Sequence, residues 1–293
     1  MKYKIKVDTI WEFGQRKDAE GNPHQEDSLY PAHKAAQASD RLFILCDGMG
    51  GHDAGEVASA TVCETMSQRI LRSCPDPEGD FDDERFEEAL ADAFAALDDT
   101  ATAQGESVAS IKKMGTTMTF LKLHQDGATI AHLGDSRVYH IRPEGDTARV
   151  VWHTEDHSLV NDLVRIGEIT PEEALTHPRK NVITRAMQPF NERPPRADIH
   201  HITDIMPGDF FYLCSDGMLE QMNDQQLCYY FSHEVDDKER AHKLAIATQD
   251  NKDNHTAIIV KIEAVTEAPV HKPDMTRVEL VGTVEDAGDA SDK

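Results

Sequence analysis

Four aspartates stand at the ends of apolar segments that are typical of buried β-strands. They are Asp47 after LFILC, Asp135 after TIAHLG, Asp216 after FFYLCS and Asp253 before HTAIIV. Glycine follows two of them, which lets the backbone turn and approach a ligand closely. One Asp-Gly pair alone indicates only a turn, but repetition after apolar runs favours a shared site. Strand ends that are far apart in sequence can meet at one end of a sheet sandwich, so we expect these carboxylates to converge.

Carboxylates that share a small volume need a counter-charge, because a buried carboxylate without one is costly. Carboxylate and carbonyl oxygens favour hard divalent cations such as Mg²⁺ and Mn²⁺. The sequence therefore predicts a divalent-metal site at these strand ends. The carbonyl of Gly48, next to Asp47, can face the same ion.

The chain as a whole is acidic. Its 293 residues suffice for one large domain or two small ones, and its formal charge of −24 disfavours nucleic acid and anionic membranes as partners. No run of about 18 apolar residues predicts a membrane-spanning helix. The first 14 residues alternate like a strand and lack the features of a signal peptide. The five cysteines have no CxxC spacing, which predicts core thiols in a reducing compartment, so we expect a cytoplasmic protein.

Hydrophobic periodicity predicts strands and helices in blocks. The expected strands are 3–13, 42–46, 116–124, 127–134, 136–143, 148–154, 209–217 and 255–263. The expected helices are 54–72, 83–104, 224–230 and 236–250, with a helix in 158–166 that ends at Gly167 and another that begins at Pro171 after a Thr170 cap.

This order indicates an α+β fold in which two antiparallel sheets pack face to face with helices outside. We expect the folded domain to span 1–263. The acidic composition of 264–293 predicts a disordered tail.

The sequences and order of several short segments resemble those of the metal-dependent protein phosphatases, the PPM or type-2C serine/threonine phosphatase family. The matching segments are QEDS (25–28), CDGMGGHDAGEVAS (46–59), GTT (115–117), AHLGDSRVY (131–139), TEDHSL (154–159), ITRAM (183–187), LCSDGM (213–218) and DNHTAIIV (253–260). A single DGxGG would be a weak signal, whereas a series in the family's order is specific. The form DGMGG, with Met49 where animal and plant members usually carry histidine, resembles bacterial members.

The resemblance implies a central β-sandwich flanked by helices, in αββα layers, with a binuclear Mn²⁺ or Mg²⁺ centre at one end. By position, it implies that the two core ions are held by Asp47, the Gly48 carbonyl, Asp216 and Asp253.

Three further acids enter through the same resemblance. Glu26 and Asp27 would act through metal-bound waters. Asp135, together with Asp216, would hold a third and weaker ion.

The implied reaction is hydrolysis of phosphoserine and phosphothreonine in proteins, opposing a serine/threonine kinase. A metal-activated water attacks phosphorus in line, so no cysteine or serine nucleophile is needed. Cys46 and Cys214 are therefore expected to be packing residues. Two alternatives stay open: a dinuclear phosphohydrolase of small phosphoesters, and a non-catalytic pseudophosphatase that binds partners. The oligomeric state is also open, with a monomer favoured.

The match is thinner at the phosphate-binding arginine. In the family this arginine usually lies three or four residues before the acidic pair, where this chain has Asn22 and Pro23. We expect an insertion that bulges outward while Arg16 still reaches the phosphate, because a guanidinium suits phosphate geometry. Another base in this role, or none, is the alternative.

With Met49 in place of histidine, no general acid is identified by position. Metal-bound water, His52 and His157 are the nearest candidates. Residues 160–195 fall where the family has a variable flap beside the site, and we expect them to tune substrate choice.

Overall fold

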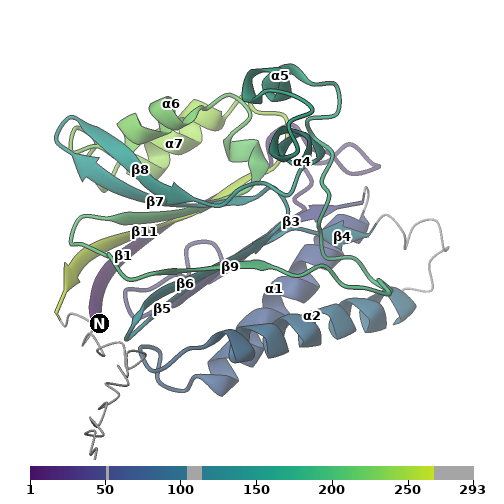
Figure 1. The fold of residues 1–293 in the computed structure, drawn as a ribbon, viewed down its shortest axis with the longest axis horizontal. Coiled ribbons are helices and arrows are strands. Elements are labelled where there is room, and N and C mark those ends of the chain that lie inside the picture. Colours follow the sequence, from purple (N-terminus) through teal and green to yellow (C-terminus); the bar gives the residue numbers. More distant parts are fainter. Residues whose placement is uncertain (51–52, 104–113, 267–293) are drawn as a thin grey trace, which may run out of the picture.

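Two antiparallel sheets pack face to face, and a pair of helices covers the outer face of each (Figure 1). The computed structural model describes residues 1–50, 53–103 and 114–266. One sheet has the strand order β1-β11-β10-β7-β8, and the other has the order β2-β3-β5-β6-β9 with β4 paired to β3. The predicted α+β sandwich is confirmed.

The first sheet contains β1 (Tyr3–Glu12), β7 (Arg137–Glu144), β8 (Thr147–His153), β10 (Phe210–Cys214) and β11 (His255–Val265). The second contains β2 (Asp27–Tyr30), β3 (Leu42–Met49), β4 (Gly115–Thr116), β5 (Met118–His124), β6 (Gly127–Leu133) and β9 (Asp198–Ile202). The helices are α1 (Asp53–Ser73), α2 (Asp83–Ala103), α4 (Leu159–Arg165), α5 (Pro171–Thr176), α6 (Asp224–Tyr230), α7 (Arg240–Thr248) and the short 3₁₀ helix η1 (Asp216–Met218).

Alternation along β3 explains the layers. Phe43 and Leu45 pack between the sheets with residues such as Leu213 of β10. Ile44 and Cys46 pack on the opposite face, against α1 and α2. Because successive side chains of a strand point to opposite faces, a strand covered on both faces needs a continuous apolar run.

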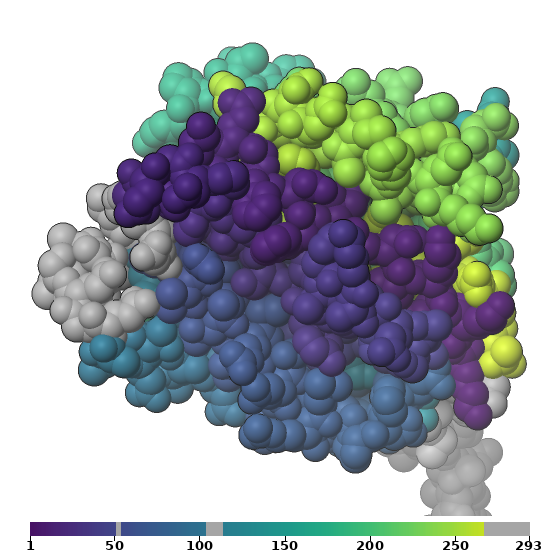
Figure 2. All heavy atoms as spheres, turned by 180° about the vertical axis from the view of Figure 1, so that it is seen from behind, coloured from purple at the N-terminus to yellow at the C-terminus, as the bar shows by residue number. Residues whose placement is uncertain are grey.

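The outer helices use the apolar stripes that the sequence predicts. In α2 the buried side chains include Phe86, Leu90, Ala93, Phe94 and Leu97. Helices α6 and α7 cover the first sheet in the same way. Seen from behind, the N-terminal segment lies between the α1 and α2 layer and the C-terminal part of the described chain (Figure 2).

Two strand ends differ from prediction at the acids. β3 continues through Asp47 to Met49, because Gly48 and Met49 pair with β4. β10 stops at Cys214, and Asp216 begins η1 instead of ending a strand 209–217. Asp47 thus lies within a strand, where backbone pairing on both sides fixes it.

The sequence does not predict β2 or β9. Both are short edge strands of the second sheet, and four or five residues carry little periodic signal. β11 runs two residues beyond its predicted end, to Val265, and residues 267–293 of the predicted tail lie outside the described residues. The Thr170 cap with Pro171 at the first helical position is confirmed as a capping box.

Within the described ranges, no helix combines the length and hydrophobicity needed to cross a bilayer.

Candidate metal centre

Segments distant in sequence bring the predicted acids to one end of the sandwich. Asp27 and Asp47 face each other on the neighbouring strands β2 and β3. Asp216 follows β10 and Asp253 precedes β11, which pairs with β10. Desolvation raises the pKa of Asp47 well above its usual range, and four nearby carboxylates raise it further: Asp27, Asp216, Asp135 and Asp253. The five groups therefore share one electrostatic environment.

Asp27 is a deeply buried member of this group. It is 4% exposed, and neither of its carboxylate oxygens has a hydrogen-bond partner among the described residues. Desolvation raises its pKa to about 7, although the Thr256 and Ser215 hydroxyls lie close enough to oppose the shift. A buried carboxylate without partners is costly. Its presence indicates that a cation, or water held by one, completes the site.

The other acids show the same excess of negative charge. Desolvation, and then the charge of Asp216, raises the pKa of Asp135 to about 8. Desolvation, and then the charge of Asp253, raises the pKa of Asp216 to about 6. Hard carboxylate ligands at one desolvated place fit Mg²⁺ or Mn²⁺.

Gly48 leaves no room for a side chain. An added Cβ would lie 2.2 Å from the carbonyl oxygen of Gly55 and 2.6 Å from that of Glu26. Its own N–H donates to the Glu26 carbonyl at 3.1 Å. The glycine after Asp47 is therefore required because helix α1 and the segment before β2 approach the end of β3 closely.

The expected insertion forms a small hairpin. Lys17 and Pro23 pair as an isolated bridge, and the Asp18 side chain accepts from the backbone N–H of Asn22 at 2.7 Å. The N–H of His24 donates to the carbonyl of Arg16 at 3.2 Å, which closes the base of the hairpin. The two ends of the inserted segment, at Arg16 and His24, therefore lie next to each other.

Arg16 lies at the acid cluster, as the insertion hypothesis requires. Its Nε donates to Asp253 Oδ1 at 2.7 Å, and its Nη2 lies 3.1 Å from Glu26 Oε2. The side chain remains 41% exposed. Its role in phosphate binding stays a prediction, but its position is compatible with that role.

Asn254 is a site residue whose role the sequence did not reveal. Its Oδ1 accepts from the N–H of Glu26 at 2.8 Å, and its Nδ2 donates to the carbonyls of Phe13 at 2.9 Å and His24 at 2.8 Å. The fully hydrogen-bonded amide thus joins both ends of the insertion to the start of β11. Only its place in the DNHTAIIV segment hinted at importance.

His24 is a second residue that the sequence did not single out. Its Nε2 lies 3.8 Å from Glu26 Oε1, and its Nδ1 lies 3.9 Å from Glu56 Oε2. It therefore borders the acid cluster from the base of the hairpin.

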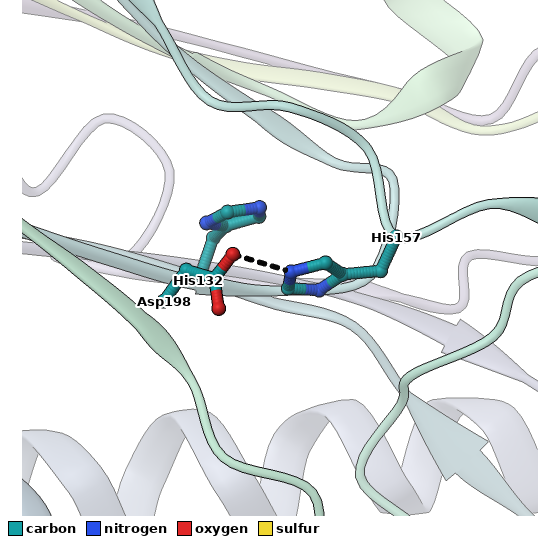
Figure 3. A group of neighbouring side chains, drawn as sticks. All are labelled: His132, His157 and Asp198. Atoms are coloured by element: carbon teal, nitrogen blue, oxygen red, sulfur yellow. Dashed lines mark hydrogen bonds and ion pairs between the residues drawn. The ribbon is translucent and has the colours of Figure 1, made fainter. Parts of the chain in front are cut away.

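A second group of side chains that could bind a metal consists of His132, His157 and Asp198 (Figure 3). Their candidate ligand atoms lie within 4.8 Å of one another. The two imidazole rings are stacked, with centroids 4.3 Å apart and planes inclined by 14°. Stacked rings point their nitrogen lone pairs along nearly parallel planes, which disfavours a shared ion.

Both nitrogens of His157 already have partners. Its Nδ1 accepts from the N–H of Gly134 at 3.2 Å, so its Nε2 carries the proton and faces Asp198 Oδ2 at 3.1 Å. Arg185 completes the group by donating to Asp198 at 2.8 Å. The arrangement supports the turn that carries Asp135 and favours a structural role for His157 over general acid. His52 lies outside the described residues.

A cleft of about 820 Å³ is lined by acids of this cluster and by residues of α4 and α5. Asp135, Asp216 and Asp253 line it. Arg137 and Asp156 form a bidentate ion pair in its wall, with N–O distances of 2.5 and 2.7 Å. Arg137 is therefore already engaged, and part of the predicted flap lines the cleft.

Comparison with known proteins agrees with this geometry. The family model described as Protein phosphatase 2C matches residues 13–247. The chain belongs to the protein phosphatase 2C family. Serine/threonine protein phosphatase PstP of Mycobacterium tuberculosis is 34% identical over 207 residues, which cover 70% of this chain and 35% of that protein. Protein phosphatase PhpP of Streptococcus pneumoniae is 32% identical over 209 residues, 71% of this chain and 79% of that protein.

Solved structures of family members share the whole fold. The M. tuberculosis phosphatase PstP/Ppp superposes with a TM-score of 0.70 at 29% identity, covering 89% of this chain and 99% of that chain. A structure of the PstP catalytic domain in complex with two manganese ions has a TM-score of 0.65 at 29% identity, with the same coverage. The chain matches only about a third of the length of the mycobacterial relatives, but most of the length of the streptococcal relative.

Proposed function

We propose that this chain is a metal-dependent phosphoprotein phosphatase that hydrolyses phosphoserine and phosphothreonine. The observation that carries the proposal is the convergence of five carboxylates at one end of the sandwich, among them Asp27, whose oxygens have no hydrogen-bond partner among the described residues. The similar proteins named as serine/threonine phosphatases support the same activity.

Asp47, the Gly48 carbonyl, Asp216 and Asp253 are the proposed ligands of two core ions, and Asp135 with Asp216 of a third. The bound ions would be Mn²⁺ or Mg²⁺, and the manganese in the related PstP structure favours Mn²⁺. Such ions supply a nucleophilic water at neutral pH and offset charge on the phosphoryl oxygens.

The protein's own residues would orient water and substrate. Glu26 and Asp27, held by β2 and by Asn254, would accept hydrogen bonds from water at the centre. Arg16 is the proposed phosphate ligand, because its guanidinium is partly exposed at the edge of the acids. It would have to share or exchange its contacts with Asp253 and Glu26 to do so.

The test is hydrolysis of a phosphothreonine peptide by the purified chain, with Mn²⁺ and with a chelator. We expect turnover that the chelator abolishes and added Mn²⁺ restores. Turnover of a generic aryl phosphate far above that of the peptide would instead indicate a small-phosphoester hydrolase. Absence of both, with Mn²⁺ bound, would indicate a pseudophosphatase.

The remaining assignments are part of the same proposal. The folded domain covers about residues 1–263, and the protein acts as a monomer against the products of a serine/threonine kinase. Its cysteines are free and buried, and desolvation raises the pKa of Cys214 to about 12. Unreactive core thiols without disulfides suit the cytoplasm.

A further inference from the structure

The cleft beside the acids is much larger than a phosphoryl group requires. Its volume of about 820 Å³ lies in the range of sites that bury a drug-sized ligand. Besides the acids, it is lined by residues of α4 and α5 and by the segment that follows η1. The cleft therefore has room for a ligand that extends well beyond its phosphate group.

One part of the lining is apolar. Val160 and Val164 of α4, Ala174 and Leu175 of α5, and Leu219 after η1 all contribute. Leu175 is 74% exposed, although it is a large aliphatic side chain. It contributes little to the core in this position, so its exposure at the cleft favours contact with an apolar ligand group.

Two lysines from segments far apart in the sequence line the same cleft. Lys180 follows α5, and Lys252 precedes β11. Within the ranges that the structure describes, neither ammonium group has an ion pair, whereas Arg137 in the same lining is tied to Asp156. Asp156 in the lining is paired with Arg137, and Glu220 accepts from the backbone N–H groups of Lys252 and Asp253. Apart from the proposed metal ligands, the two lysines therefore outnumber the one remaining carboxylate of the lining, which favours negative groups there.

We propose that this flap-side part of the cleft binds the polypeptide next to the phosphorylated residue and selects segments that combine an aliphatic side chain with acidic side chains. The aliphatic group would lie against Leu175 and Val164, and the carboxylates would face Lys180 and Lys252. The inference rests on the proposed function, because the phosphate must be held at the acids for the flanking residues to reach this surface.

The experiment compares phosphothreonine peptides that differ only in their flanks: Leu with Glu, Leu with Lys, and Ser with Glu. Binding is measured by fluorescence anisotropy with a non-hydrolysable phosphonate in place of the phosphate, and kcat/KM is measured with the phosphopeptides. Because exposed charge pairs contribute modestly, we expect the Leu-Glu peptide to be preferred over the Leu-Lys peptide by about five-fold.

Lys180→Glu should abolish or reverse the charge preference, and Leu175→Asp should remove the preference for leucine. Lys180 is the informative lysine, because Lys252 adjoins the proposed ligand Asp253. The matched control is Lys238→Glu, an exposed charge reversal before α7 that should leave both preferences intact. Hydrolysis of an aryl phosphate should be unchanged in all three variants.

Equal binding of all three peptides by the wild type, or a charge preference that survives Lys180→Glu, would overturn this inference. Turnover without any flank preference would overturn it while leaving the proposed function standing. Selective binding that is lost in Lys180→Glu, without turnover of any phosphoester, would support the cleft and overturn the proposed activity.

Discussion

Asp27 and Asp209 are equally hidden from solvent, at 4% and 1% exposure, but their surroundings are opposite. Asp209 accepts from Arg142 Nε at 2.7 Å, from Arg142 Nη2 and His140 Nε2 at 2.8 Å, and from the N–H of Met206 at 2.9 Å. Burial acts to raise its pKa, but hydrogen bonds from Arg142 and His140 lower it to about 2. Asp27, without such partners, has its pKa raised to about 7.

The difference separates a structural acid from a ligand-binding one. A buried carboxylate that the protein fully satisfies stabilises the fold, whereas one left unsatisfied stores a cost that a bound cation removes. The same criterion separates the acid cluster from the group of His132, His157 and Asp198. In that group, hydrogen bonds and ring stacking satisfy the side chains internally.

The largest expected effect is on activity at the acid cluster. Asp47→Asn and Asp253→Asn should each lower kcat by more than about 100-fold, since loss of even an outer partner of a metal ligand typically costs 10–100-fold. Circular dichroism should show an intact fold. A near-normal rate in either variant would show that the ligand assignment is wrong.

Asp209→Asn should lower stability and leave activity nearly unchanged. Removing one partner of a buried charge network should cost about 3 kcal/mol of unfolding free energy, because Arg142 loses its buried carboxylate and keeps only the exposed Asp204. Urea denaturation checks the loss, and kcat of the folded fraction should stay near the wild-type value. If Asp209→Asn abolished turnover at full stability, the distinction between the two acids would fail.

The pH dependence of stability should have opposite slopes for the two acids in chelator-treated protein. The folded pKa of Asp27, about 7, lies above its unfolded value, so its contribution is present below about pH 4 and is lost as the pH rises through 7. The folded pKa of Asp209, about 2, lies below its unfolded value, so its contribution is present above about pH 4 and is lost as the pH falls through 2.

Asp27→Asn should therefore flatten the decline in unfolding free energy between about pH 4 and 7, by a few kcal/mol at most, at about 1.4 kcal/mol per pKa unit. Asp209→Asn should flatten only the acid limb. Thermal or urea unfolding across pH measures both, and added Mn²⁺ should remove the neutral-pH decline in the wild type. An unchanged slope in Asp27→Asn would contradict the unsatisfied state of this carboxylate.

The smallest expected effect belongs to Arg16. Arg16→Ala should raise KM for a phosphopeptide about five-fold, because one guanidinium contact at a partly exposed site is lost. The control is Arg72→Ala, which removes an exposed arginine in the last turn of α1. An unchanged KM would show that Arg16 does not bind the phosphate and that another basic residue, or none, has this role.

Much of this architecture could be predicted because it depends on local pattern. Continuous apolar runs such as LFILC identify strands buried on both faces. The acids next to these runs identify the end of the sandwich at which the carboxylates meet. The start of α5 at Pro171 was predicted from its cap, because that signal is contained in four residues.

The rest depends on contacts between distant segments. β2 has four residues and exists because it pairs with β3, which places Asp27 opposite Asp47. The position of Arg16 depends on closure of the hairpin, and the role of Asn254 depends on three backbone groups more than 200 residues away. No sequence period encodes such long-range hydrogen bonds.

The hairpin of residues 16–24 is closed at its base, where Asn254 holds both ends. Near its tip, a Cβ added at Gly21 would have open space around it. Because the base is closed separately, the length of the tip can change without moving the residues at the acid cluster. An experimenter could likewise attach a fluorophore or an epitope at Glu20 without disturbing the acid cluster.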